Sequence, residues 1–206
     1  MKRKTPVRHT VCSHKRKGKW VRSFTRGTGQ KSQIPRKVVR PTHYEDKYGV
    51  RRKIPTTTRG LKLKVAHGIR DRVERYARRM GLDPSEIKYK YKSTGRPPAH
   101  MRIKFVRPSY EVIGYVLEVN TAHFGGILTY TPNFYDHYMD YMVAHELGHM
   151  KHIKEVGVKK VEAMPTFMDE DYADEWAYKV SGRDPDRLTK RMRMIEKRLE
   201  EMGVVE

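Results

Sequence analysis

The sequence predicts an α+β domain preceded by a basic arm. Two observations support this prediction. The spacing of apolar residues changes along the chain, from alternation within residues 87–119 to helical spacing after residue 136. The charge is also unevenly distributed, because residues 1–60 hold 19 Lys and Arg against two acids, whereas residues 61–206 hold 26 against 22. We therefore expect a basic arm and linker over residues 1–60 and a folded domain over residues 61–206.

The excess of positive charge defines the arm. Residues 1–60 carry a net charge of +17, and the first forty residues contain no acidic side chain. A segment that cannot neutralise itself stays extended as a solvated tail or binds a polyanion, either nucleic acid or an anionic membrane. We expect nucleic acid, contacted by basic side chains and one aromatic ring of the arm. These residues are Lys15, Arg16, Lys17, Lys19, Trp20, Arg22 and Arg26.

The arm contains one predicted element, a β-hairpin at about residues 10–27. Two similar segments, 11–16 and 21–26, flank the turn residue Gly18, and alternation about a glycine-containing turn is typical of a hairpin. Two strands alone are only marginally stable in water, so this hairpin should need a docking surface or a ligand. It resembles short His-x-Arg hairpin segments of some archaeal and phage proteins. Residues 27–60 lack periodicity and are interpreted as a linker.

The folded domain is expected to begin with a helix and to continue with strands. Apolar side chains recur at helical spacing from His67 to Met80, just before a glycine that can end a helix. The segments that follow alternate or are rich in β-branched residues, which is typical of strands. The expected strands cover residues 87–92, 101–106, 111–119 and 126–130.

Three further helices are expected to complete the domain. One apolar stripe runs from about residue 136 to Gly157, and a second covers residues 169–181. Asp184 and Pro185 form an N-cap followed by proline at the first helical position, so the third helix begins there. This helix could pack on the domain or on a second copy of the chain. Its apolar stripe consists of Leu188, Met192, Ile195, Leu199 and Met202.

The helix that begins near residue 136 carries a metal-binding pattern. His145-Glu146-Leu147-Gly148-His149 fits His-Glu-x-x-His. Residues four apart lie one above the other on a helix, so both imidazoles can reach one ion. Glu146 lies beside them and is placed to hold a water molecule rather than the metal. Zinc suits two neutral imidazoles and one carboxylate and leaves a fourth position for water, so we predict one zinc ion per chain.

A carboxylate on the next helix completes the predicted set. Glu170 begins the pattern Glu-x-x-Ala-Asp, which ends at Asp174, so Glu170 can bind the ion while Asp174 accepts a hydrogen bond from a ligating imidazole. With both motifs, residues 61–182 resemble the gluzincin metallopeptidases, and most of all the small intracellular ImmA/IrrE-type peptidases. The resemblance implies a minimal zincin-like fold. It also implies roles for five residues: His145, His149 and Glu170 as ligands, Glu146 as general base and Asp174 as the partner of a ligand.

Several nearby side chains leave alternatives open. His152 lies almost on the helical face of His149, so it could compete as a ligand, support one, contact substrate or serve only as a polar helix residue. Acids beside Glu170 allow a shift of the third ligand; they are Asp169, Asp171 and Glu175. Candidates for a side chain that assists the reaction are Tyr172, Tyr178 and His123, while His67, His100 and His137 receive no role.

Together these features predict a zinc metallopeptidase. Glu146 would take a proton from water and deliver it to the leaving amine during hydrolysis of a peptide bond. An extended peptide substrate would pair with the strand expected at residues 126–130. The basic arm would associate the enzyme with nucleic acid. The alternative is a nucleic-acid-binding, structural or regulatory protein of a virus or mobile element that keeps the fold with little turnover.

Composition excludes several other classes. No apolar run approaches the ~18–20 residues of a membrane-spanning helix, and the N-terminus lacks the apolar segment of a secretory signal. A single cysteine, Cys12, excludes an internal disulfide framework and a cysteine-rich zinc finger. The expected compartment is the cytoplasm, with no contact to a membrane.

Overall fold

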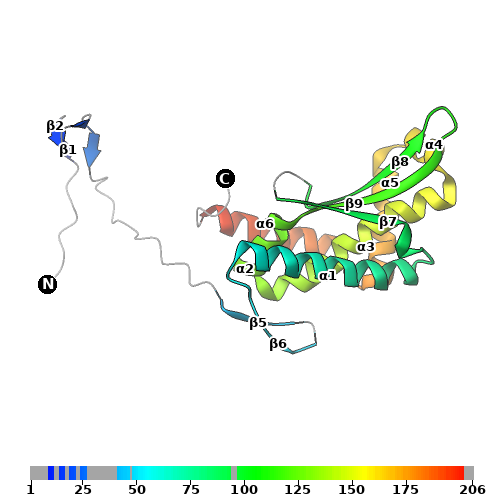
Figure 1. Cartoon of the computed structure of the whole chain (residues 1–206), viewed down its shortest axis with the longest axis horizontal. Helices are drawn as coiled ribbons and strands as arrows, with labels where there is room; N and C mark the ends of the chain where they lie inside the picture. The colour runs from blue at the N-terminus through cyan, green and yellow to red at the C-terminus, as the bar shows by residue number, and fades with distance from the viewer. Residues whose placement is uncertain are drawn as a thin grey trace. The chain divides into compact units, whose positions relative to one another are not determined.

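The computed structural model describes residues 9–11, 14–16, 19–21, 24–26, 41–46, 48–93 and 97–201. Contacts between residues divide the chain into two compact units, Met1–Val38 and Val39–Glu206, which we call the N-terminal unit and the main unit. Within the described residues the architecture is α+β, as the sequence predicted, with a three-stranded mixed sheet and helices in the main unit (Figure 1).

The N-terminal unit contains the expected hairpin. Its outer and inner strand pairs are both antiparallel, and His14 opposite Val21 continues the register set by Val11 opposite Phe24. The four short strands therefore belong to one hairpin. Two residues of the expected nucleic-acid set, Lys17 and Arg22, lie outside the described residues. The strands are β1 (His9–Val11), β2 (His14–Arg16), β3 (Lys19–Val21) and β4 (Phe24–Arg26).

The segment interpreted as a linker is partly structured, which corrects that interpretation. Residues 43–53 form a hairpin whose turn is held by the carboxylate of Asp46, which accepts two backbone N–H groups at 2.9 and 3.0 Å. Thr57 then caps the first helix, well before the start expected at His67. Strands of three residues are too short to show a period, so no pattern in the sequence indicated them. The elements are β5 (His43–Glu45), β6 (Arg51–Lys53) and α1 (Thr58–Arg79).

Three strands form the sheet of the main unit. The strand that comes last in the chain lies in the centre; it pairs in parallel with the first strand and antiparallel with the second. The second strand is consequently an edge strand. One face of the sheet is apolar and packs on the helices. In chain order the elements are the 3-10 turn η1 (Pro84–Glu86), β7 (Ile87–Lys92), β8 (Ala99–Val106) and β9 (Glu111–Asn120).

The strand expected at residues 126–130 does not exist; these residues lie in helix α2 (Thr121–Tyr130). Asn120 starts this helix, because its side-chain oxygen accepts hydrogen bonds from two backbone N–H groups of the first turn at 3.1 and 3.2 Å. Periodicity alone cannot assign a short apolar run to a strand or to a buried helix. Pro132 then begins the next helix.

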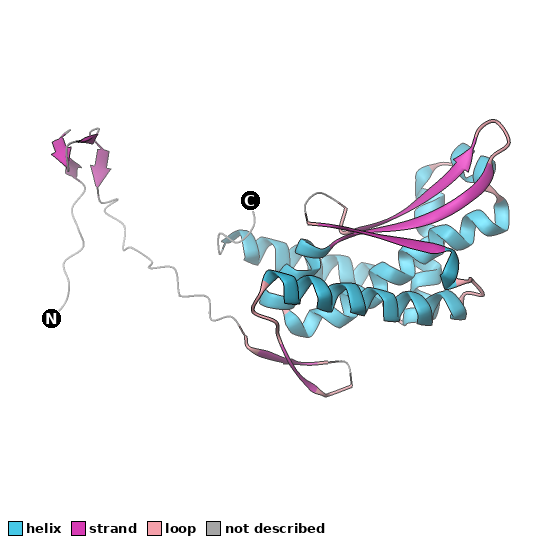
Figure 2. Cartoon of the chain, viewed as in Figure 1, coloured by secondary structure: helices cyan, strands magenta, loops and turns pink. Residues whose placement is uncertain are grey.

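The remaining helices pack with α1 on one side of the sheet (Figure 2). As predicted, Gly157 ends the helix that carries the His-Glu-x-x-His pattern. A short helix that the sequence did not predict follows it. The helices are α3 (Pro132–Val156), α4 (Val158–Ala163), α5 (Thr166–Ser181) and α6 (Pro185–Glu201).

The apolar stripe of α6 packs on the main unit itself. Leu188, Met192 and Ile195 are buried in the common core, while the side chains of Leu199 and Met202 lie outside the described residues. Contact with a second copy of the chain stays a prediction. No helix within the described residues combines the length and apolar character that crossing a bilayer requires.

Candidate metal centre

The centre forms where α3 and α5 approach each other closely. At the crossing, a Cβ atom on Gly148 would lie 2.7 Å from Cα of Ala173 and 2.9 Å from its carbonyl oxygen, a distance that no real side chain tolerates. Glycine in the pattern therefore lets α5 lie directly against α3. This approach brings Glu170 and Asp174 of α5 to His145 and His149 of α3.

Three donor atoms converge at this crossing. The Nε2 atoms of His145 and His149 are 3.2 Å apart, and Glu170 Oε2 lies 3.2 Å from Nε2 of His145. The other carboxylate oxygen of Glu170 is 3.8 Å from Nε2 of His149. All three ligand atoms lie within 4.8 Å of one another, and among the described residues they form the one such group of His, Cys, Asp or Glu.

The outer nitrogens of both imidazoles are held by carboxylates. Nδ1–H of His145 donates to Asp174 (2.7 Å), the contact that the sequence led us to expect. Nδ1–H of His149 donates to Asp169 (2.8 Å), a residue that sequence reasoning considered only as a rival ligand. Because each Nδ1 donates its proton outward, Nε2 is the ring nitrogen of each imidazole that faces the centre.

The same carboxylates extend the network outward. Asp169 also accepts a hydrogen bond from Nδ1–H of His152 (2.5 Å), and the ring of His152 stacks on Tyr172 with centroids 4.1 Å apart. Tyr141, which the sequence did not single out, donates its hydroxyl to Asp174 (2.5 Å). His152 is thus buried beside the centre and bound to Asp169, outside the cluster of three donors.

The electrostatics of the cluster match a site that holds one cation. Burial disfavours the charged form of His145, but hydrogen bonds to Asp174 and Glu170 outweigh burial and raise its pKa to about 10. Burial and the neighbouring His145 lower the pKa of His149. The hydrogen bond with His145 lowers the pKa of Glu170. Without a metal, one proton therefore occupies the place that a metal ion would take.

Glu146 lies at the floor of a groove between α3 and the edge strand β8. Its side chain is almost fully buried, burial raises its pKa, and one carboxylate oxygen accepts the backbone N–H of Met101 at 2.5 Å. The groove has a volume of about 510 Å³ and also exposes His145, His149 and Glu170. On the side of helices α3 and α4, its apolar lining consists of Met142, Ile153, Val158 and Val161.

The strand beside the centre is therefore β8. This corrects the expectation that residues 126–130 would accept a peptide, because those residues are helical and do not line the groove. The alternation of residues 101–106 predicted this strand, but nothing in a single sequence says which strand lies at the edge of the sheet.

Two accessory candidates lie away from the groove. Tyr178 is 57% exposed on α5 and does not line it, and His123 packs its ring against Phe124 and Tyr138. His100, which received no role, is an exposed residue of β8 that does line the groove.

The donor set fits a divalent metal ion. Two imidazole nitrogens and one carboxylate are the ligands that zinc takes in sites with three protein ligands, and both imidazoles have the carboxylate partners usual for metal-bound histidine. The side chains of His145 and His149 are only 12% and 14% exposed, whereas Glu170 is 52% exposed and leaves the centre accessible from the groove.

Comparison with known proteins gives no relative: no protein-family model, curated protein or solved structure matches this chain. The resemblance to gluzincins thus rests on the residues and geometry of the centre.

Proposed function

We propose that this protein is a zinc-dependent metallopeptidase. The observation that supports this most strongly is the position of the three donors, which open into a groove that also contains the carboxylate of Glu146 and the free edge of a strand. A metal site that served structure alone would be closed by a fourth protein ligand, whereas a catalytic site keeps one position open.

The residues of the centre would have two separate roles in hydrolysis, metal binding and proton transfer. His145, His149 and Glu170 would hold the ion, which when bound supplies a Lewis acid and an acidified water. Glu146 accepts the proton of that water and returns it to the leaving amine. Its raised pKa suits both steps, because a carboxyl group that is too acidic cannot hold the proton between them.

The edge of β8 would align the substrate. In an antiparallel pair, alternate residues direct their backbone N–H and C=O groups away from the partner strand. The N–H of Met101 points to Glu146 rather than to β9, so Ala99 and Ile103 also present their backbone groups to the groove. An extended peptide can pair with these groups and place one of its carbonyls beside the centre.

The basic arm would associate the enzyme with nucleic acid. Residues 1–60 carry +17, and the described hairpin places the backbone of Lys15 opposite that of Trp20. Lysine and arginine side chains bind phosphates, and aromatic rings can stack on exposed bases.

One observation favours the second candidate, a nucleic-acid-binding, structural or regulatory protein of a virus or mobile element with little turnover. The carboxylate of Glu146 already accepts the N–H of Met101, and the side chain is almost closed off from solvent. A base that stays engaged in this way would act slowly.

The deciding experiment compares zinc content and casein cleavage in wild type, Glu146→Gln and Glu162→Gln. Glu162 lines the same groove but is paired with Arg107, so its change is the matched control. Glu146→Gln should keep zinc and lose about 10²–10⁴-fold in rate, since glutamine cannot accept a proton. The control should cleave like wild type.

Two results would count against the peptidase. Full activity in Glu146→Gln would remove this residue from the role of general base. A zinc-loaded wild type that cleaves neither casein nor a mixed peptide library would favour the protein with little turnover.

A further inference from the structure

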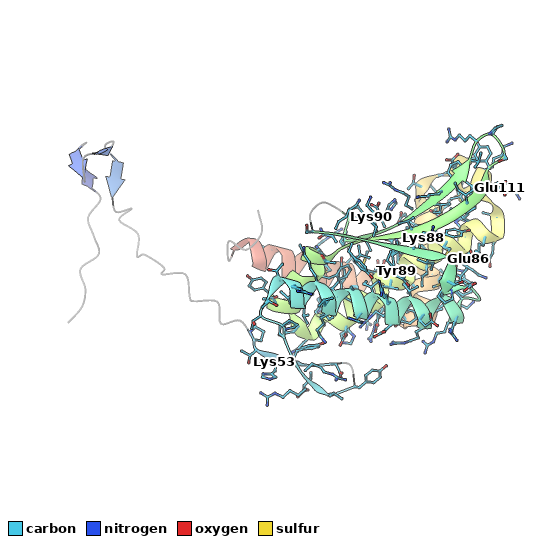
Figure 3. The ribbon with its side chains drawn as sticks, viewed as in Figure 1. Lys53, Glu86, Lys88, Tyr89, Lys90 and Glu111 are labelled. Atoms are coloured by element: carbon cyan, nitrogen blue, oxygen red, sulfur yellow. The ribbon has the colours of Figure 1, made fainter. Side chains whose placement is uncertain are left out.

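The face of the sheet that points away from the helices is strongly basic. On β7 the residues of the opposite, inner face pack on α1: the hydroxyl of Tyr91 donates to the carbonyl of Ala66, and Arg70 lies over the ring of Tyr89. Figure 3 shows Tyr89 between β7 and α1, with Lys90 on the other side of the strand. The outward residues, which we call the cationic face, are Lys88, Lys90, Lys92, His100, Arg102 and Lys104.

One acidic residue lies at the centre of this face and organises it. Glu118 of β9 lies opposite Lys90 on one side and His100 on the other. Its carboxylate is 3.1 Å from Nζ of Lys90 and 3.8 Å from Nη1 of Arg102, and it also binds Lys92. The carboxylate itself is only 7% exposed, whereas the cations around it are 42–56% exposed. An approaching partner would therefore meet the cations.

This face carries an excess of positive charge. Its five permanent cations stand against two acids, Glu118 and Glu111, which gives a net charge of +3, out of +8 for the whole main unit. Glu111 lies at the far end of the sheet (Figure 3). The cations of the sheet therefore gather on one surface, around Glu118.

The chemistry of the face fits the backbone of duplex nucleic acid. Alternate residues of a strand are about 6.6 Å apart and neighbouring strands about 4.8 Å apart, so the cations form a fixed array on a rigid support. Duplexes carry one negative charge per about 1.7 Å of axis. Among the described residues this face offers no Phe, Tyr or Trp ring on which a base could stack, whereas proteins that bind single strands rely on such rings.

We propose that the cationic face binds the phosphate backbone of double-stranded nucleic acid without reading its sequence. The contact is separate from the basic arm and lies in the folded main unit. Strand β8 carries both Arg102 of this face and Met101 of the groove. A bound duplex would therefore be separated from the metal centre by the width of this one strand. If the proposed peptidase function holds, proteins bound to the same duplex would be presented to the groove.

The test measures binding of the full-length chain to a fluorescent duplex of arbitrary sequence at several salt concentrations. The face variant is Lys88→Gln with Lys90→Gln and Lys104→Gln, which leaves Lys92 and Arg102 beside Glu118. The matched control removes three exposed lysines elsewhere in the main unit: Lys62→Gln, Lys159→Gln and Lys160→Gln. Circular dichroism, thermal unfolding and zinc content establish that both variants fold.

The expected result is a change in salt dependence that is specific to the face. If all three lysines contact phosphates, the slope of log affinity against log salt should become shallower by about two to three units in the face variant, and by less than one in the control. Equal losses in both variants would overturn the proposal, because net charge alone would then explain binding.

Three further experiments distinguish this face from other sources of binding. If Lys15→Gln with Arg16→Gln and Lys19→Gln flattens the slope while the face variant behaves like the control, nucleic acid belongs to the arm and the proposal fails. Tighter binding to the single strand than to the duplex would also overturn it. The proposal would also be overturned if the wild-type protein bound phosphatidylserine vesicles as tightly as the duplex and the face variant no longer bound them. None of these measurements depends on peptidase activity, so the proposal can fail while the peptidase stands.

Discussion

Helix α3 carries two buried polar clusters that are built in opposite ways. Near its start, the guanidinium of Arg72 donates to Asp140 (2.8 Å), to Asp136 (2.7 Å) and to the carbonyl oxygen of Gly68 (3.0 Å). Arg183 also lies 3.6 Å from Asp140, so the cations that balance these carboxylates belong to the protein itself. The cluster joins α1 to α3.

Farther along the same helix, the cluster around His145 and His149 is satisfied only on its outside. Carboxylates occupy both Nδ1 positions, while both Nε2 atoms and Glu170 face one another at 3.2–3.8 Å. The cation that this arrangement needs must come from solution. The comparison shows that burial of polar groups does not by itself mark a site, whereas donors that converge without an internal cation do.

The largest expected effect is the loss of metal from the second cluster. His149→Ala removes one of three ligands, so the purified protein should hold less than a tenth of the zinc of wild type, as measured by metal analysis. His152→Ala is the control, because His152 touches Asp169 rather than the centre. Equal zinc loss in both variants would mean that His152 is a ligand. A full zinc content in His149→Ala would contradict the assignment of His149 as a ligand.

The first cluster should govern stability instead. Arg72→Met removes the cation that contacts both Asp136 and the buried Asp140, with Arg183 remaining 3.6 Å from Asp140, which should lower the free energy of unfolding by about 3–5 kcal/mol in urea titrations. The control is Arg78→Met on the same helix, whose ion pair with Glu74 is exposed and should contribute less than about 1 kcal/mol. Similar losses in both variants would contradict the distinction between the clusters.

Asp169 should tune the centre without binding metal. Asp169→Asn weakens the support of His149, so zinc affinity should fall by about 10–100-fold while one zinc still binds at saturation. Asp171→Asn, an exposed neighbour on α5, should bind zinc like wild type. Competition with a chelator measures both variants. A complete loss of binding in Asp169→Asn would instead make Asp169 the third ligand.

The last effect concerns the pH dependence of zinc binding. Zinc must displace the proton of His145, whose pKa is raised to about 10 rather than the usual 6.5. The affinity for zinc should therefore rise about tenfold per pH unit from pH 6.5 to 8.5, with one proton released per ion. Calorimetry in buffers of different ionisation enthalpy counts that proton. An affinity that levels off above pH 7.5 would mean that the pKa of His145 is ordinary.

The amino-acid pattern was enough to predict the α+β class, the hairpin of the N-terminal unit and the pairing of His145 with His149. These follow from local rules, because the period of apolar residues selects strand or helix and a spacing of four places two side chains on one helical face. The Glu-x-x-Ala-Asp pattern likewise indicated Glu170 and Asp174 through their spacing of one helical turn.

Which groups contact these residues depends on how the elements pack together. The strand expected at 126–130 became a helix because Asn120 caps it and both of its sides can be buried, which a short apolar run does not reveal. The contacts of Asp169 with His149 and of Met101 with Glu146 join residues far apart in the chain. Such contacts depend on how closely α5 and β8 approach α3, and Gly148 permits the first of these approaches. Local patterns place side chains on an element, whereas packing decides what those side chains face.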